Sequence, residues 1–236
     1  MSQLIFENIS IGYEGKAVAE NISFSVGQGD YLCILGANGS GKSTLIKTIL
    51  RLQEPLKGSF ESCDGFNFGE IGYLPQQMEM QRDFPASVQE IIMSGFLNRS
   101  RFLPFYKRSE KQKAEQIMNT LEIFELRKSL YRNLSGGQKQ RVLLARAMCA
   151  AVGMILLDEP ASGLDSRASS EMYESISRIN RDGTTVIMVT HDHAVAMKYA
   201  SHILCVGKKV GFYTKEEYCG RVVKNNIFDK GENDNA

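Results

Sequence analysis

The chain has 236 residues, of which 43% are hydrophobic and 23% are charged, and its formal net charge at pH 7 is +1. This length and composition are those of a globular protein with one sizeable core, or with a core and an inserted subdomain. The near-neutral charge argues against a dedicated nucleic-acid binder, because such proteins carry a strong basic excess.

Cysteine usage and hydropathy narrow the class further. The five cysteines are scattered, and none forms a Cys-x-x-Cys pair. That distribution suits reduced thiols in a cytosol better than a disulfide framework or a zinc site. No secretory signal is visible at the start, and no apolar run approaches the roughly 18 residues needed to cross a bilayer. If the protein works at a membrane, we expect another chain to supply the membrane span.

The first part of the chain predicts strands, then a glycine-rich turn and a helix. Residues 4–11 alternate loosely between apolar and polar side chains and residues 22–26 alternate cleanly, so both predict strands with one buried face. Residues 31–35 are wholly apolar, which is typical of a buried parallel strand. After the turn at 36–41, apolar residues at helical spacing predict an amphipathic helix.

Between about residues 77 and 135 helical patterns dominate, and we predict an inserted helical subdomain there. Strands and helices then alternate again, with helices predicted at 138–150 and near 167–180 and strands at 154–157, 184–189 and 203–206. This alternation implies a mainly parallel, doubly wound sheet. We therefore predict one domain over residues 1–225 and a polar, flexible tail at 226–236.

The glycine-rich turn carries a phosphate-binding pattern. Residues 36–43, GANGSGKS, fit GxxxxGK[ST] at every fixed position and lie between an apolar strand and an amphipathic helix. Glycines let successive backbone N–H groups converge on phosphates, and the helix N-terminus adds positive potential. Lys42 can then reach the β- and γ-phosphates, while the Ser43 hydroxyl can ligate Mg²⁺. The predicted nucleotide-binding residues here are Gly36, Asn38, Gly39, Ser40, Gly41, Lys42, Ser43 and Thr44.

The predicted strand at 154–157 ends in two carboxylates, Asp158 and Glu159. Open α/β sheets bind ligands at the C-terminal edge of their strands, so Asp158 can hold Mg²⁺ there, through water, as the corresponding aspartate of nucleotide hydrolases does. Glu159 is free to polarise a water for attack on the γ-phosphorus. Two acids at the start of a loop are common by themselves, but the phosphate loop favours the catalytic interpretation.

A second candidate anion-binding helix start follows at residues 134–138, LSGGQ, where Ser135 is an N-cap candidate and Gly136 and Gly137 expose backbone N–H groups. With this pentapeptide the sequence resembles the ATP-binding-cassette family, whose signature motif is LSGGQ. The resemblance covers nearly the whole chain. It implies a P-loop NTPase (RecA-like) core with a mainly parallel sheet, an N-terminal antiparallel β subdomain and an inserted helical signature subdomain.

The resemblance also assigns roles to single residues. Tyr13 looks like the aromatic residue that stacks on adenine. Gln76 is similar to the glutamine that touches Mg²⁺ and links the core to the helical subdomain, although Gln77 follows it and leaves the choice open. Asp165 ends a loop similar to the one through which two subunits sense each other, and it could also cap the next helix.

His191 matches the family's switch histidine, which donates to the γ-phosphate and holds the water and Glu159 in place. The catalytic residues implied are therefore Glu159, His191 and Lys42. The run His191-Asp192-His193 could instead suggest a metal site, but no third ligand is evident from the sequence.

In this family ATP binds between the phosphate loop of one subunit and the signature of another. The chain carries one of each, so the resemblance implies that two cassettes, in a homodimer, complete a pair of sites. Ser135, Gly136, Gly137 and Gln138 would then close a site whose phosphate loop lies in the facing copy.

The class of ABC protein is indicated by which other sequence features accompany the cassette. The sequence shows neither the sustained heptads of chromosome and repair ATPases nor the second cassette of translation factors, so we expect a transporter subunit that binds no nucleic acid. Its partners would be a multi-span membrane permease and an extracytoplasmic solute-binding protein, and its place the cytoplasmic face of the membrane.

The transported substrate is indicated by one stretch. Residues 84–95, with Arg101-Phe102 and the short C-terminus, resemble the zinc/manganese branch of prokaryotic importers. An iron-chelate, haem or vitamin B12 importer is the close alternative, and a non-transport ABC ATPase is less favoured. Basic residues at 99–113 could meet anionic lipid headgroups, but a solvated helix face is the favoured interpretation.

Overall fold

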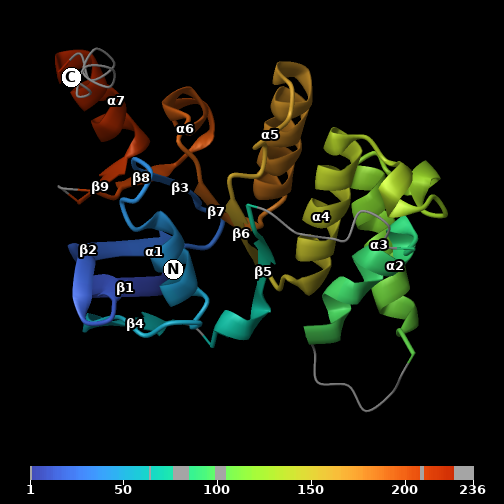
Figure 1. The fold of residues 1–236 in the computed structure, drawn as a ribbon, viewed down its shortest axis with the longest axis horizontal. Helices are drawn as coiled ribbons and strands as arrows, with labels where there is room; N and C mark the ends of the chain where they lie inside the picture. Colours follow the sequence, from blue (N-terminus) through green and yellow to red (C-terminus); the bar gives the residue numbers. More distant parts are fainter. Residues whose placement is uncertain (1, 64, 77–84, 99–104, 208–209, 226–236) are drawn as a thin grey trace.

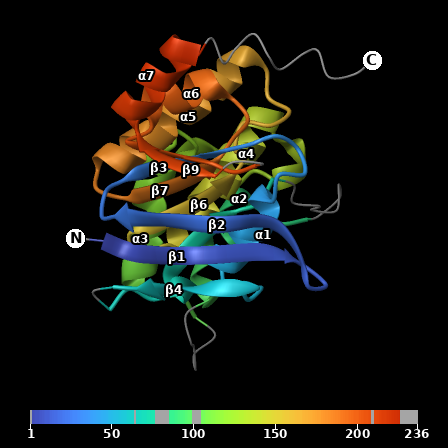
Figure 2. The same ribbon diagram turned by 90° about the vertical axis from the view of Figure 1, so that its left-hand side faces the viewer.

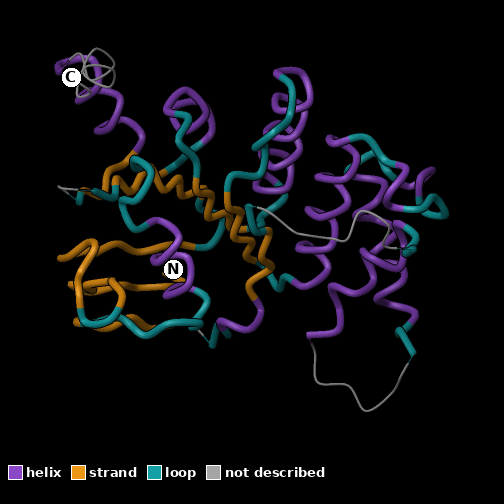
Figure 3. Tube along the Cα trace, viewed as in Figure 1, coloured by secondary structure: helices purple, strands orange, loops and turns teal. Residues whose placement is uncertain are grey.

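The computed structural model describes residues 2–63, 65–76, 85–98, 105–207 and 210–225. Figure 1 shows two sheets toward one end of the molecule and a group of helices at the other. The same division is plain in the trace of Figure 3, where strands gather in one half and a helical group fills the other. Among the described helices, none is long and apolar enough to cross a membrane.

The smaller sheet is antiparallel, with the order β2-β1-β4, and consists of β1 (Ser2–Tyr13), β2 (Lys16–Gly27) and β4 (Lys57–Ser62). Ile22, Phe24 and Val26 of β2 are buried, as their alternation predicts. Phe24 stacks on Phe6 of β1, with 4.3 Å between the ring centroids. In Figure 2 this sheet lies below, well separated from helices α5, α6 and α7 above. The predicted N-terminal antiparallel β subdomain is confirmed.

The larger sheet has six strands in the order β5-β6-β7-β3-β8-β9 and is parallel except for β9. Its strands are β3 (Tyr31–Leu35), β5 (Ile71–Leu74), β6 (Met154–Asp158), β7 (Thr185–Val189), β8 (His202–Cys205) and β9 (Gly211–Thr214). Every residue of β3, β6 and β7 is buried, which explains why their sequences are apolar on both faces. The mainly parallel core sheet is confirmed.

The core is divided between the two faces of this sheet. Tyr31, Cys33 and Leu35 of β3 pack into a cluster with the helices, whereas Leu32 and Ile34 face a second cluster shared with the antiparallel sheet. Successive strand side chains point to opposite faces, so β3 serves both clusters. Helix α1 (Lys42–Ile49) contributes to the second cluster and lies between the two sheets.

The remaining α-helices are α2 (Val88–Met93), α3 (Arg108–Thr120), α4 (Gly136–Ala150), α5 (Ser166–Arg181), α6 (His193–Tyr199) and α7 (Lys215–Asn225). Short 3-10 turns include η2 (Ser94–Asn98). The described parts of residues 77–135 are helical or loop, as expected for the predicted insertion, while 77–84, 99–104 and the predicted tail at 226–236 lie outside the described residues.

Two glycines, one in β5 and one in η2, lie close against the backbone of helix α4. A Cβ added to Gly72 of β5 would lie 2.1 Å from the Ala147 carbonyl oxygen, and one added to Gly95 of η2 would lie 2.2 Å from the Arg146 carbonyl oxygen. Only glycine allows this close approach of backbones. The helix therefore joins the parallel sheet to the helical group.

Candidate functional site

The phosphate loop connects β3 to α1, in the position that the sequence predicts. The Lys42 ammonium donates hydrogen bonds to the carbonyl oxygens of Gly36 (2.7 Å) and Ala37 (2.9 Å), so its charged end is folded over the loop. Gly39 and Gly41 have φ angles of 78° and 101°, a left-handed conformation that favours glycine. These glycines make the tight turn into α1.

Two features of this loop fit an anionic ligand. The Ser40 hydroxyl is buried and lacks a hydrogen-bond partner among the described residues, although buried polar groups are nearly always paired. Helix α1 begins without a side-chain cap, which leaves its first N–H groups to other acceptors. A phosphate group would satisfy both sets of donors.

The carboxylates lie at the end of β6. Asp158 is buried, and burial together with the neighbouring Glu159 charge raises its pKa to about 6, against the opposing effect of Lys42. Glu159 follows with a φ angle of 47°, a left-handed conformation that is uncommon for a residue other than glycine. Its backbone N–H donates to the Val189 carbonyl oxygen at 3.0 Å. Strain of this kind is often found at functional sites.

The ends of three neighbouring strands meet at the Glu159 carboxylate. The Gln76 amide, which follows β5, donates to Glu159 Oε2 at 3.1 Å. His191, which follows β7, places Nδ1 3.3 Å from Glu159 Oε1. The Glu159 side chain is 13% exposed and that of His191 is 71% exposed. Sequence-distant residues therefore converge at one carboxylate. Gln76 makes the described contact, and its neighbour Gln77 lies outside the described residues.

His193 is directed elsewhere. It begins α6, and its Nδ1 lies 2.6 Å from the Tyr218 hydroxyl of α7. Asp192 caps that helix by accepting from the N–H groups of Ala194 and Val195. Among the described residues, no group of three or more His, Cys, Asp or Glu side chains could hold a metal ion.

A cavity of about 280 Å³ unites the phosphate loop with this strand edge. Its lining residues are Tyr13, Val18, Asn38, Gly39, Gly41, Lys42, Ser43, Thr44, Gln76, Asp158 and Glu159. The cavity brings Ser43, Gln76 and Asp158 together, and their hydroxyl, amide and carboxylate oxygens are the hard donors that Mg²⁺ prefers. The donor set therefore fits a magnesium ion.

Tyr13 and Val18 form the apolar end of this cavity. The Tyr13 ring is 45% exposed, and the Lys47 ammonium lies 5.5 Å from its centroid. A hydrogen bond to Thr44 and the Lys47 charge lower the pKa of Tyr13, against an opposing effect of burial. Val18 is 43% exposed and was missed by the sequence analysis. The sequence feature that could have identified Val18 is an apolar side chain on the otherwise polar face of β2.

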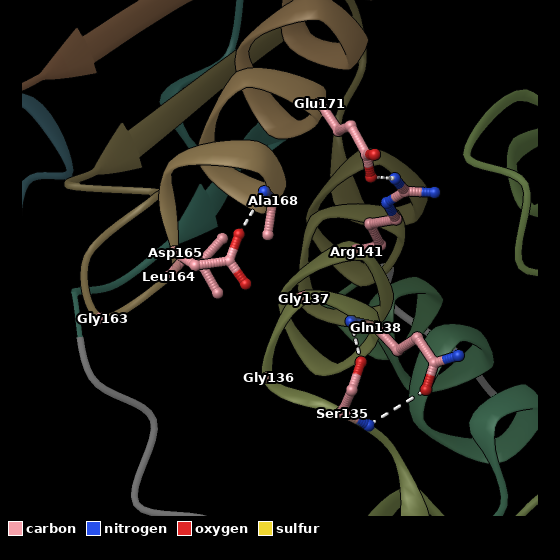
Figure 4. A pocket seen from close by; sticks show the side chains of 10 residues that line it. All are labelled: Ser135, Gly136, Gly137, Gln138, Arg141, Gly163, Leu164, Asp165, Ala168 and Glu171. Carbon is pink, nitrogen blue, oxygen red and sulfur yellow. Dashed lines mark hydrogen bonds and ion pairs between the residues drawn. The ribbon is translucent and has the colours of Figure 1, made fainter.

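The signature residues line a second cavity, of about 450 Å³, which shares no lining residue with the first. Figure 4 shows it between the N-terminal ends of α4 and α5. The Ser135 hydroxyl accepts from the Gln138 N–H (3.3 Å), and the Gln138 side chain accepts from the Ser135 N–H (3.0 Å), so the predicted N-cap is part of a capping box. Asp165 caps α5 by accepting from the Ala168 N–H at 2.8 Å. The lining residues are Ser135, Gly136, Gly137, Gln138, Arg141, Gly163, Leu164, Asp165, Ala168 and Glu171.

Known proteins are similar to this chain in sequence. The family model described as ABC transporter matches residues 19–162. The zinc import ATP-binding protein ZnuC of Hydrogenovibrio crunogenus is 32% identical over 203 residues, which cover 86% of this chain and 78% of that protein. The manganese transport system ATP-binding protein MntB of Bacillus subtilis is 34% identical over 211 residues, covering 87% and 84% respectively.

A solved structure agrees in fold. A metal-chelate type ABC transporter in an inward-facing conformation superposes with a TM-score of 0.82 at 29% identity, over 92% of this chain and 84% of that one. The matched family model covers the phosphate loop, the signature and both carboxylates of the β6 end. The chain therefore belongs to the ABC transporter family, as an ATP-hydrolysing cassette of the kind these transporters use.

Proposed function

We propose that the chain is the ATP-binding and ATP-hydrolysing subunit of a prokaryotic ABC importer for divalent metal ions, either zinc or manganese. The observation that carries this proposal is the similarity to relatives named for zinc import and for manganese transport, at 32% and 34% identity over most of the chain. Of the residues 84–95 that suggested the same branch, 85–95 lie at the start of the helical group, and residue 84 is outside the described residues.

The first cavity is proposed as the nucleotide site. Tyr13 would stack on the base, and the N–H groups of residues 36–44 with Lys42 would hold the phosphates. Ser43, Gln76 and Asp158 would hold Mg²⁺, which when bound neutralises charge on the phosphate oxygens. The proposal is supported by the buried Ser40 hydroxyl, which lacks a described partner, and by the oxygen donors that line one cavity.

Glu159 is proposed as the general base. Its carboxylate accepts from Gln76 and lies beside His191, so both neighbours can fix its orientation toward an attacking water. His191, with its largely exposed ring, would donate to the γ-phosphate. The Glu159 carboxylate contacts Gln76 and His191, whereas Asp158 is proposed as a metal ligand, so one carboxylate would serve the metal and the other the water.

The second cavity is proposed as the surface that closes on another copy. Ser135, Gly136, Gly137 and Gln138 line it together with Asp165, and it shares no lining residue with the nucleotide cavity. The family resemblance implies that a complete site needs both cavities, one from each of two chains. The proposed assembly is a homodimer at the cytoplasmic face of the membrane, bound to a multi-span permease that works with an extracytoplasmic solute-binding protein.

A second candidate substrate class is a metal chelate. The inward-facing transporter with a similar cassette is of the metal-chelate type, and it is 29% identical to this chain. An iron-chelate, haem or vitamin B12 importer is therefore the alternative, ahead of a non-transport ABC ATPase. The relatives named for zinc import and manganese transport favour the free ion.

Transport by the complete assembly tests the proposed substrate. The chain and its permease would be placed in vesicles with the solute-binding protein, and ATP hydrolysis and ion uptake would be measured with Zn²⁺, Mn²⁺, a ferric chelate and vitamin B12. We expect zinc or manganese alone to be taken up and to stimulate hydrolysis. Uptake of a chelate would establish the alternative, and stimulation by DNA or ribosomes in place of the permease would overturn transport altogether.

A further inference from the structure

Helices α4 and α5 lie side by side, and small residues line the mouth of the space between them. A Cβ added to Gly137 would lie 3.4 Å from the Ala168 Cβ, and one added to Gly136 would lie 3.7 Å from Leu164 Cδ2. Both are ordinary van der Waals distances, so a methyl group would fit at either position. Without side chains, the two glycines make no side-chain contact that could fix the spacing of α4 and α5.

One turn further along both helices, a charged pair replaces the small residues. Arg141 Nη2 lies 2.6 Å from Glu171 Oε2, and Figure 4 shows the two side chains reaching toward each other across the cavity. Arg141 follows Gly137 by four residues and Glu171 follows Ala168 by three, so each lies on the same helix face as its partner at the mouth. The Arg141 side chain is 18% exposed and that of Glu171 is 43% exposed, so solvent screens this pair in part.

Arg141 also contacts two residues that follow α3. Arg141 Nη1 donates to the Leu121 carbonyl oxygen at 3.4 Å and lies 3.7 Å from a carboxylate oxygen of Glu122. The other carboxylate oxygen of Glu122 lies 3.5 Å from Arg178 of α5. Glu122 has a φ angle of 57°, a left-handed conformation that a residue with a side chain adopts at a cost. Together these contacts link the end of α3, α4 and α5.

We propose that Arg141 and Glu171 are positioning residues that hold the signature end of α4 and the Asp165 end of α5 at a fixed spacing, so that both meet a second copy of this chain as one surface. This inference rests on the proposed function, because that surface matters only if a second copy binds there. Glycine and alanine at the mouth carry no side-chain group that could fix the spacing of the two helices, and the charge-assisted hydrogen bond between Arg141 and Glu171 supplies such a contact.

The test is ATP-dependent dimerisation, measured by light scattering in a Glu159→Gln background that slows hydrolysis. Glu171→Ala and Arg141→Ala should each raise the ATP concentration at half-maximal dimerisation about tenfold, the effect of losing one charged hydrogen bond. The affinity of the monomer for a fluorescent ATP analogue should change by less than about twofold, and the thermal midpoint by only a few degrees. Glu171→Gln keeps the side-chain volume and should give an intermediate result.

Arg167→Ala is the matched control. Arg167 also pairs with Glu171, at 3.0 Å, but it lies on the same helix and its side chain is 90% exposed. Its removal should leave dimerisation within about twofold of the parent, because exposed pairs of this kind contribute little.

Several results would overturn the inference. Normal dimerisation of Glu171→Ala would do so, and so would a loss that appears only together with lower monomer affinity and lower thermal stability. If the Glu159→Gln parent itself stays monomeric with ATP, the two-copy site of the proposed function fails instead, and the inference fails with it.

Discussion

At the scale of single residues, the proposed hydrolysis depends most on Glu159 and the residues that contact its carboxylate. The Glu159 carboxylate accepts a hydrogen bond from the Gln76 amide at 3.1 Å and lies 3.3 Å from His191 Nδ1, while the Glu159 backbone has a left-handed conformation. The sequence predicted Glu159 from an apolar strand followed by two acids, and the family resemblance supplied Gln76 and His191. The resemblance also implied that His191 holds Glu159 in place, but the contact of Gln76 with Glu159 was not predicted, because it depends on where β5 lies in the sheet.

Glu159→Gln should lower the rate of ATP hydrolysis at least a hundredfold and leave ATP affinity nearly unchanged, since an amide cannot accept the proton of the attacking water. Steady-state hydrolysis and equilibrium nucleotide binding would measure the two effects. Glu115→Gln, at an exposed position of α3, is the control and should behave like the parent. Normal turnover in Glu159→Gln would mean that another group is the base.

The Ser40→Ala variant distinguishes a role of the hydroxyl in ATP binding from a role in the stability of the fold. The Ser40 hydroxyl is buried and makes no hydrogen bond with the described residues, so its removal should change the free energy of unfolding by less than about 1 kcal/mol or increase it slightly. If the hydroxyl donates to a phosphate, the dissociation constant for ATP should rise about tenfold. Denaturant unfolding without nucleotide and ATP titration would be compared. Unchanged ATP affinity would show that the hydroxyl serves another purpose.

At the scale of elements, the strands that were predicted best are the fully buried ones. The apolar runs of β3 and β6 allowed no other interpretation once their glycine and acidic ends were considered. By contrast, β4, β5, β9, α6 and α7 were not predicted. Strand β4 is mostly exposed, β5 and β9 have only four residues each, and α6 has seven. Such elements take their form from neighbouring strands and helices more than from their own sequence.

Gly72→Ala should destabilise the protein by about 1–3 kcal/mol, because the added methyl would overlap the α4 backbone. Gly207→Ala is the matched control, since a Cβ there meets no atom within 4 Å, and it should change stability by less than about 1 kcal/mol. Urea unfolding followed by circular dichroism measures both. Equal stability of the two variants would contradict the close contact between β5 and α4.

Strand β3 also predicts a pH dependence of stability. Burial raises the pKa of the Cys33 thiol well above its usual value. Above about pH 8.5 the unfolded chain loses this proton while the folded chain keeps it, so the free energy of unfolding falls by up to about 1.4 kcal/mol per pH unit. Below pH 8.5 both states hold the proton and the effect vanishes. Cys33→Ala should therefore reduce the fall in stability between pH 8.5 and 9.5, and an identical fall in both proteins would contradict the burial of the thiol.

At the scale of the whole molecule, the motifs are divided between two cavities. The phosphate loop and the β6 end line one, and the signature with the Asp165 loop lines the other. The fold class was predictable because strand–helix alternation and the motif order both point to it. The pairing of Arg141 with Glu171 was not, because residues 30 positions apart on two helices meet only through tertiary packing.

A complementation experiment tests the central claim that two copies make one ATP site. Lys42→Ala should inactivate the phosphate loop, and Ser135→Arg should obstruct the signature, so each variant alone should hydrolyse almost no ATP. In a mixture, half of the dimers contain one copy of each, and each of these has one site with both halves intact. The mixture should therefore recover up to about one quarter of the parental activity. Recovery of measurable hydrolysis is the predicted result, and a mixture as inactive as its components would contradict a site shared between two chains.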